Sequence, residues 1–223
     1  MLHISPSVLS ANFATLGADA ERVRKAGASM LHLDVMDGVF VPNMSFGMPV
    51  IASLRKKSRL FFDVHLMITD PGRYIDQFAK AGADIISFHY ESCDNHAEVI
   101  KKIKANEVRA AMAISPATPY EVVLPFIKDL SMVLVMTVVP GFGGQKLIPE
   151  TLEKVRALRK YANENGLELD IEVDGGITLE NMGDTTAAGA NVIVSGSTIF
   201  NATKPKQVIS KMHEIAKKNP FVE

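Results

Sequence analysis

An apolar stretch near the start of the chain carries two side chains that could do chemistry together. Within residues 31–38, His32 and Asp34 stand two positions apart in a hydrophobic run that breaks at an Asp-Gly pair. Side chains alternate between two faces in a strand, so His32, Asp34 and Met36 are expected on the same face. Burying an imidazole and a carboxylate is costly unless each has a partner. That partner could be a metal ion or a ligand, or His32 could be a hydrogen-bonded core histidine.

Composition and charge limit the class of protein. The chain has 223 residues, of which 47% are hydrophobic and 22% charged, and its formal net charge is -1. These values fit one globular domain over residues 1–223, with a sizeable core. The near-neutral charge gives no basic footprint for nucleic acid or for an anionic membrane surface. The expected partner is therefore a small molecule.

Two features bear on where the protein works. No apolar run approaches the roughly 20 residues of a membrane span, and the start of the chain lacks the basic and long apolar regions of a signal peptide. Cys93 is the single cysteine, so no intrachain disulfide can form. Both features favour a reducing compartment, and we expect a cytoplasmic protein.

A short Ala-Gly-Ala motif occurs three times, each time directly before an apolar run. Its glycines are Gly27, Gly82 and Gly189. Each motif is typical of a helix that ends at a left-handed glycine and leads into a buried strand. The spacings of 55 and 107 residues are close to two and four multiples of about 27, and the chain is long enough for about eight such units.

Eight expected strands alternate with eight expected helices. The strands are expected at about 3–8, 30–35, 60–66, 84–89, 108–114, 132–138, 169–174 and 191–195. The helices are expected at about 14–26, 48–57, 72–81, 95–105, 119–128, 149–165, 178–188 and 204–218. This alternation predicts an α/β protein, a single-domain (β/α)8 TIM barrel. A doubly wound open sheet is the alternative, but no dinucleotide-type glycine fingerprint follows the first strand.

Several polar residues are expected late in these strands, where the active site of a closed barrel lies. They are Ser7, His32, Asp34, His65, His89 and Asp174. Two histidines and two aspartates at one mouth would supply a ligand set that suits zinc, manganese, iron or cobalt. Either His65 or His89 could instead be a core histidine, and for His89 that interpretation is at least as good. The methionines expected on the same side are Met36, Met67 and Met136.

Three glycine-rich segments follow the last three expected strands, at residues 140–145, 174–176 and 195–197. Glycines let backbone amides approach an anion closely, and the loops after strands seven and eight often bind phosphate in such barrels. The pattern favours a phosphate cradle over three plain turns. Residues 38–47 form a long apolar loop, which could close over the mouth as a lid or only pad the rim.

Taken in order, these motifs resemble one known family. The likeness begins at Ser5-Pro6-Ser7 and continues to the last expected helix, through residues 32–38, 40–43, 65–67, 136–138, 140–145, 172–176 and 196–197. These segments closely resemble the ribulose-phosphate 3-epimerases. That family is a (β/α)8 barrel of the pentose phosphate and Calvin pathways, and it interconverts D-ribulose 5-phosphate and D-xylulose 5-phosphate.

The resemblance implies a role for each matching residue. It implies one divalent metal ion per chain (zinc, iron, manganese or cobalt), with the ligands His32, Asp34, His65 and Asp174. Asp34 would accept a proton and Asp174 would donate one, with the roles exchanged in the reverse direction. Ser7 and His65 would contact the substrate. Its phosphate would be held by Gly141, Phe142, Gly143, Gly144, Gly175, Gly176, Gly196 and Ser197.

The implied reaction agrees with these residue types. Epimerisation at C3 needs a base on one face of the carbon and an acid on the other. The metal would polarise the C2 carbonyl and stabilise the enediolate that develops. The sulfur atoms of Met36, Met67 and Met136 could line this planar intermediate without donating a stray proton. The resemblance also implies a homo-oligomer.

Three positions depart from the family pattern, and none of them is an implied ligand. They are Val39, Ser115 and Val139. Three other functions compete with the implied one: 3-epimerisation of a six-carbon ketose phosphate such as D-allulose 6-phosphate, a phosphate-binding lyase or decarboxylase, and a non-catalytic sugar-phosphate sensor. A lyase or decarboxylase usually needs an active-site lysine, and the expected strands contain none, although Lys146 lies just beyond the glycine-rich loop.

Overall fold

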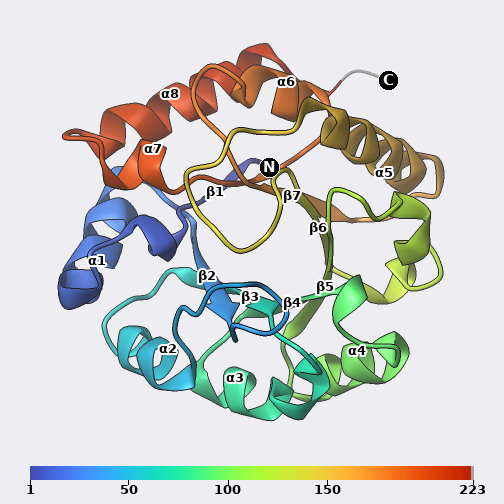
Figure 1. Cartoon of the computed structure of the whole chain (residues 1–223). Helices are drawn as coiled ribbons and strands as arrows, with labels where there is room; N and C mark the ends of the chain where they lie inside the picture. The colour runs from blue at the N-terminus through green and yellow to red at the C-terminus, as the bar shows by residue number, and fades with distance from the viewer. Residues whose placement is uncertain (222–223) are drawn as a thin grey trace.

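Eight parallel strands form one sheet that curls into a barrel, and helices surround it (Figure 1). The computed structural model describes residues 1–221 of the chain. The sheet order is β1-β8-β7-β6-β5-β4-β3-β2, and a parallel bridge between Ser7 and His32 closes the barrel. The predicted (β/α)8 barrel is confirmed. The strands are β1 (His3–Ser5), β2 (Met30–Met36), β3 (Phe61–Met67), β4 (Ile85–His89), β5 (Arg109–Ile114), β6 (Met132–Met136), β7 (Asp170–Asp174) and β8 (Val192–Val194).

The alternation along β2 divides its side chains between the two sides of the barrel wall. Leu31, Leu33 and Val35 join the hydrophobic core cluster that lies between the strands and the helices. His32 and Asp34 instead contact side chains of β3 and β7 inside the barrel. The apolar half of the strand therefore holds the wall in place, and the polar half faces the interior.

The helices pack amphipathic faces onto the outside of the barrel. In α1, for example, the buried residues Leu16, Ala20 and Val23 recur at helical spacing. Within residues 1–221, no helix is both long enough and apolar enough to span a lipid bilayer. The helices are α1 (Leu16–Ala26), α2 (Met48–Arg55), α3 (Ile75–Ala81), α4 (His96–Ala105), α5 (Leu152–Glu164), α6 (Met182–Ala187), α7 (Ser197–Phe200) and α8 (Pro205–Lys218).

The three Ala-Gly-Ala motifs form the predicted joints between helix and strand. Gly27, Gly82 and Gly189 have φ angles of 106°, 107° and 108°, in the region that favours glycine. At Gly82 a Cβ atom would also lie 2.5 Å from the Cδ of Arg55. The Gly82 amide donates to the Ala79 carbonyl and so ends α3.

The helix expected over residues 119–128 is wrong. The structure has two 3-10 segments there, Tyr120–Val123 and Ile127–Asp129. Pro125 lies between them, and a proline has no N–H to donate while its ring clashes with the preceding turn. The short helix α7, which follows β8, was not among the expected helices. Neither difference changes the strand order, so the strand ends still meet at one mouth.

Candidate active site

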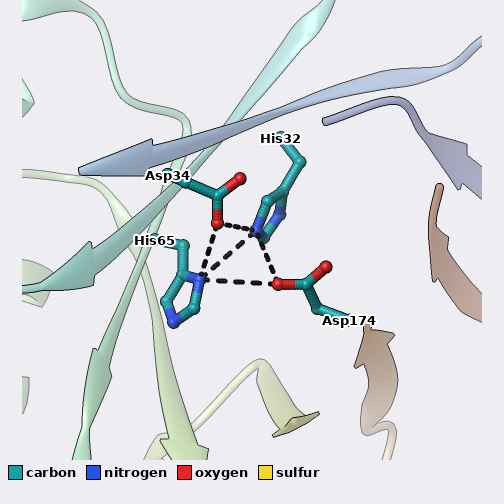
Figure 2. A group of neighbouring side chains, drawn as sticks. All are labelled: His32, Asp34, His65 and Asp174. Atoms are coloured by element: carbon teal, nitrogen blue, oxygen red, sulfur yellow. Dashed lines mark hydrogen bonds and ion pairs between the residues drawn. The ribbon is translucent and has the colours of Figure 1, made fainter. Parts of the chain in front are cut away.

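Four side chains from three strands meet inside the barrel (Figure 2). His32 Nε2 lies 3.1 Å from Asp34 Oδ1 and 3.3 Å from His65 Nδ1. His65 Nδ1 is 3.2 Å from the same Asp34 oxygen. Asp174 Oδ2 lies 3.7 Å from His32 Nε2 and 4.0 Å from His65 Nδ1. The structure therefore brings together the four residues that the sequence analysis assigned to a metal.

These distances fit a single divalent ion. Zinc binds nitrogen and oxygen ligands at about 2.0–2.1 Å, so neighbouring ligand atoms of a tetrahedral site are about 3.3 Å apart. The five separations above span 3.1–4.0 Å, and all four ligand atoms lie within 4.8 Å of one another. Two imidazoles and two carboxylates without a thiolate suit zinc, manganese, iron or cobalt. The donor set therefore fits the implied metal.

The charges around the cluster also favour a cation. Burial lowers the pKa of His32, but the Asp34 and Asp63 carboxylates outweigh burial and raise that pKa well above its usual value. Burial raises the pKa of Asp34, yet His32 and His65 outweigh it and hold that pKa below its usual range. A positive charge, whether a proton or a metal ion, is thus stabilised between these carboxylates.

Asp174 differs from Asp34 in its acidity. Burial, followed by the nearby Asp34 charge, raises the pKa of Asp174 to about 7. Its side chain is still 15% exposed, whereas that of Asp34 is 3% exposed. In the metal-free protein at neutral pH, Asp34 is ionised while much of Asp174 carries a proton. Two carboxyl groups whose environments separate their pKa values are the arrangement expected of a base and an acid.

The residues that contact His32 Nδ1, on the side of the ring away from the other ligands, were not among the predicted site residues. The Nδ1–H of His32 donates to Asp63 Oδ2 at 2.6 Å, and the Ser5 hydroxyl donates to the same oxygen at 3.3 Å. Glu172 Oε1 lies 3.5 Å from the same His32 nitrogen. Burial, followed by the Asp63 charge, raises the pKa of Glu172 well above its usual value.

A sequence signal for Asp63 and Glu172 did exist. Asp63 precedes His65 by two positions, and Glu172 precedes Asp174 by two positions. Side chains two apart in a strand share a face, so both carboxyls had to point into the barrel with the ligands. Both residues are completely buried.

Asp34 and Asp174 face a cavity of about 570 Å³ at the mouth of the barrel. Ser7 is part of its wall, and the Ser7 hydroxyl donates to Asp34 Oδ2 at 2.6 Å. His65, for which the resemblance also implies a substrate contact, is fully buried and does not line the cavity. The cavity is also lined by the other residues that the sequence analysis assigned to substrate or intermediate, namely Met36, Met67, Met136, Gly141, Phe142, Gly143, Gly144, Gly175, Gly176, Gly196 and Ser197.

The glycine-rich loops come close to other backbone and side-chain atoms. Gly176 has a φ of 69°, and a Cβ there would collide with the Leu147 backbone nitrogen. At Gly196 a Cβ would lie 2.5 Å from the Ser10 Oγ. A side chain at either position would push the loops apart, so glycine allows their backbones to line the cavity directly.

The apolar loop over residues 38–47 lies against the loop after β6. The Asn43 side-chain amide donates to the Gly141 carbonyl at 2.8 Å, which joins the two loops. The departures Val39 and Val139 are 76% and 62% exposed. Neither valine lines the cavity, so these two changes leave its wall unaltered.

The fold and the site define a (β/α)8-barrel protein with a candidate His2Asp2 metal centre below a glycine-lined cavity. The model of the ribulose-phosphate 3 epimerase family matches residues 3–200, and the chain belongs to that family.

Individual relatives agree with the family match. The chain is 50% identical to the cytoplasmic isoform of ribulose-phosphate 3-epimerase from Oryza sativa subsp. japonica, over 95% of this chain and 92% of the relative. It is 45% identical to ribulose-phosphate 3-epimerase from Bacillus subtilis, over 95% and 98% of the two chains. Among solved structures, 3-hexulose-6-phosphate synthase from Salmonella typhimurium shares the fold, with a TM-score of 0.74, 16% identity and coverage of 98% and 100%.

Proposed function

We propose that this protein is a metal-dependent ribulose-phosphate 3-epimerase, which interconverts D-ribulose 5-phosphate and D-xylulose 5-phosphate. Family membership supports the reaction. The observation that carries it in this chain is the pair Asp34 and Asp174, which face one cavity from β2 and β7 with separated pKa values. An epimerase needs these two carboxyl groups in different protonation states, because one must take a proton while the other gives one.

The metal ligands in this proposal are His32, Asp34, His65 and Asp174, and the ion is zinc, iron, manganese or cobalt. When bound, one such ion would polarise the C2 carbonyl of the ketose and stabilise negative charge on its oxygen atoms. The convergence of these four ligand atoms, all within 4.8 Å of one another, supports this assignment.

The proton transfers are assigned to the two aspartates. Asp34 removes the proton from C3 of D-ribulose 5-phosphate, and the electron pair left behind forms the enediolate across C2 and C3. Asp174 then delivers its own proton to the opposite face of C3, which inverts that centre. Asp34 ends protonated and Asp174 ends ionised, so the reverse reaction starts from the state that the forward reaction leaves.

Other residues orient the base and protect the intermediate. Ser7 fixes Asp34 by its 2.6 Å hydrogen bond to Oδ2, which leaves Oδ1 on the metal side. Met36, Met67 and Met136 line the cavity with sulfur and methylene groups, which exclude water and carry no exchangeable proton. A planar enediolate between them would be reprotonated only by the aspartates.

The substrate phosphate is assigned to the glycine-rich end of the cavity. Backbone amides can approach a phosphate closely where glycines replace larger residues, and the loops after strands seven and eight are the usual phosphate site of this barrel. The residues of this proposed subsite are Gly141, Phe142, Gly143, Gly144, Gly175, Gly176, Gly196 and Ser197.

Three broader features belong to the same proposal. We infer that residues 1–223 form one catalytic domain, that the protein works in the cytoplasm and that it assembles as a homo-oligomer. The name of the rice relative, a cytoplasmic isoform, supports the compartment. The family resemblance supports the oligomer.

Proton NMR in D2O tests the reaction. The metal-loaded protein should convert D-ribulose 5-phosphate into D-xylulose 5-phosphate that carries deuterium at C3, while the unreacted substrate initially keeps its protium. Product that retains the original proton would contradict the two-base assignment. If only a six-carbon substrate such as D-allulose 6-phosphate turned over, the substrate assignment would be wrong. Binding without turnover of either sugar would favour a sensor.

A further inference from the structure

A chain of hydrogen bonds leads away from His65 on the side opposite the metal ligands. Figure 2 shows the second ring nitrogen of His65 pointing away from the other three side chains. That nitrogen, Nε2, lies 2.9 Å from His89 Nε2. His89 Nδ1 lies 3.1 Å from Glu91 Oε2. Both histidines are completely buried, and the Glu91 side chain at the far end is 27% exposed.

The loop after β5 holds Glu91 in place. Glu91 Oε1 accepts the Ser115 backbone N–H at 2.8 Å and also the Thr118 hydroxyl. Lys154 donates to the carbonyls of Ser115 and Pro116 at 3.1 and 2.7 Å, which fixes this loop to α5. The departure at Ser115 does not weaken the chain, because only its backbone N–H is used.

The ionised carboxylate at the far end determines which nitrogen of each ring carries hydrogen. A carboxylate can only accept, so His89 Nδ1 must be the donor to Glu91. In a neutral imidazole the other nitrogen is then an acceptor, so His89 Nε2 accepts from His65 Nε2–H. It follows that His65 Nδ1 keeps its lone pair, and this is the nitrogen that faces Asp34 and Asp174.

The opposite arrangement is unfavourable at the carboxylate. If His65 Nδ1 carried the hydrogen, His65 Nε2 would be an acceptor and His89 Nε2 would have to donate to it. His89 Nδ1 would then direct a lone pair at the Glu91 carboxylate across 3.1 Å. Two facing lone pairs repel each other and leave buried polar atoms without a hydrogen bond. At the other end of His65, a cation bound between Nδ1 and Asp34 Oδ1 would remove the corresponding repulsion.

Ring packing fixes the same two imidazoles. The His65 and His89 rings stack with centroids 5.0 Å apart and an angle of 27° between their planes. The Phe40 ring, from the loop over residues 38–47, also packs against the His89 ring, with centroids 4.9 Å apart. The His89 ring therefore has little freedom to rotate, and neither has its hydrogen bond to His65.

We propose that His89 and Glu91 are positioning residues of the metal centre, which hold His65 in the one tautomer and ring orientation that offer its Nδ1 to a cation. The inference rests on the metal site of the proposed function. In metal sites the second nitrogen of a histidine ligand usually donates to such a partner, and loss of that partner typically lowers metal affinity about 10–100-fold. His32 has a carboxylate directly behind it, whereas His65 reaches its carboxylate through a second histidine.

Zinc affinity tests the proposal in the full-length protein. The zinc dissociation constant is measured by competition with a chromogenic chelator for the wild type, Glu91→Gln and His89→Phe. We expect both variants to bind zinc about 10–100-fold more weakly. Glu121→Gln is the matched control, since it removes one exposed carboxylate from the segment after the same loop and should leave the affinity unchanged.

A second readout reports the tautomer without any metal. Long-range 1H–15N correlation spectra of the histidine rings in the metal-free protein should show more hydrogen on His65 Nε2 in the wild type than in His89→Phe or Glu91→Gln. In the variants the tautomer should shift toward Nδ1–H, because Asp34 still accepts a hydrogen bond on that side. A purely structural role would lower the melting temperature without changing this spectrum or the zinc affinity.

The outcomes test the hydrogen-bond relay, which is the chain from His65 through His89 to Glu91, separately from the metal site. Unchanged zinc affinity and an unchanged His65 tautomer in folded Glu91→Gln would overturn the proposal. His89→Gln is the conservative variant, because its amide oxygen can accept from His65 Nε2–H, and it should recover much of the affinity lost in His89→Phe. If the wild type itself bound no zinc, manganese, iron or cobalt, the metal site would be wrong and the relay with it.

Discussion

Replacing Asp174 with asparagine should remove the activity and yet stabilise the metal-free protein. The carboxyl group has a pKa of about 7 instead of 3.8, a rise of about three units. At about 1.36 kcal/mol per unit, ionised Asp174 destabilises the metal-free fold by about 4 kcal/mol. Asparagine keeps the shape of the side chain and cannot ionise, so this penalty disappears.

The sign of the effect depends on pH. The folded protein holds the Asp174 proton more tightly than the unfolded chain does. The penalty is therefore absent below pH 4, grows as the pH rises toward 7 and is complete above that value. Metal-free Asp174→Asn should melt about 10 °C higher than the metal-free wild type at pH 8, since about 1 kcal/mol shifts the melting temperature by about 2–4 °C in a protein of this size. At pH 4 the two should melt together.

Thermal unfolding after chelator treatment and dialysis measures this difference. With saturating zinc the order should reverse, because the variant has lost one ligand and gains less from binding. Asp34→Asn is the matched comparison and should lower the melting temperature of the metal-free protein above pH 4. The pKa of Asp34 is lowered in the fold, so its ionised form stabilises the protein in that range. Both variants should be inactive. If the melting temperature of metal-free Asp174→Asn exceeded that of the wild type by the same amount at pH 4 and pH 8, the electrostatic argument would be refuted.

Three further perturbations test the rest of the site. Ser197→Asp should raise KM for the sugar phosphate about tenfold or more, because a carboxylate beside a phosphate costs about 1.4 kcal/mol or more. Steady-state kinetics measure KM, with Ser197→Ala as the uncharged control. An unchanged KM in Ser197→Asp would contradict the placement of the phosphate. Asp63→Asn should weaken zinc binding about 10–100-fold, as measured by chelator competition, and equal affinity would remove Asp63 from the metal centre. Chelation should abolish epimerisation and zinc, manganese, iron or cobalt should restore it; full activity in metal-free protein would exclude a required metal.

Strand periodicity explains why the wall of the barrel could be predicted from the sequence. Each strand is a short apolar run bounded by a helix end, and the glycine caps at Gly27, Gly82 and Gly189 mark three of these boundaries. The convergence of residues from β2, β3 and β7 then follows from closure of the sheet. The helix predicted over residues 119–128 is wrong because their apolar pattern suits a helix, whereas Pro125 interrupts the hydrogen bonds that a helix would need.

The chemistry of the cluster could be predicted only in part. Residue types identify possible ligands, but the difference between Asp34 and Asp174 arises from burial and from neighbours on other strands. Glu91 could not be found at all, because it follows β4 in a 3-10 segment and its partners Ser115 and Thr118 come from a distant loop.

The register of the sheet accounts for the different support of the two histidines. His32 pairs with Asp63 across β2 and β3, so a carboxylate stands directly beside its Nδ1. His65 pairs with Ser87 across β3 and β4, and the Ser87 hydroxyl donates to the Val64 carbonyl instead.

The support for His65 must therefore come from the next inward-facing position of β4, which is His89. An imidazole there still needs an acceptor for its own N–H, and the first carboxylate beyond the strand end is Glu91. The relay is thus a consequence of strand register: the barrel places a carboxylate one strand away from one ligand and two hydrogen bonds away from the other.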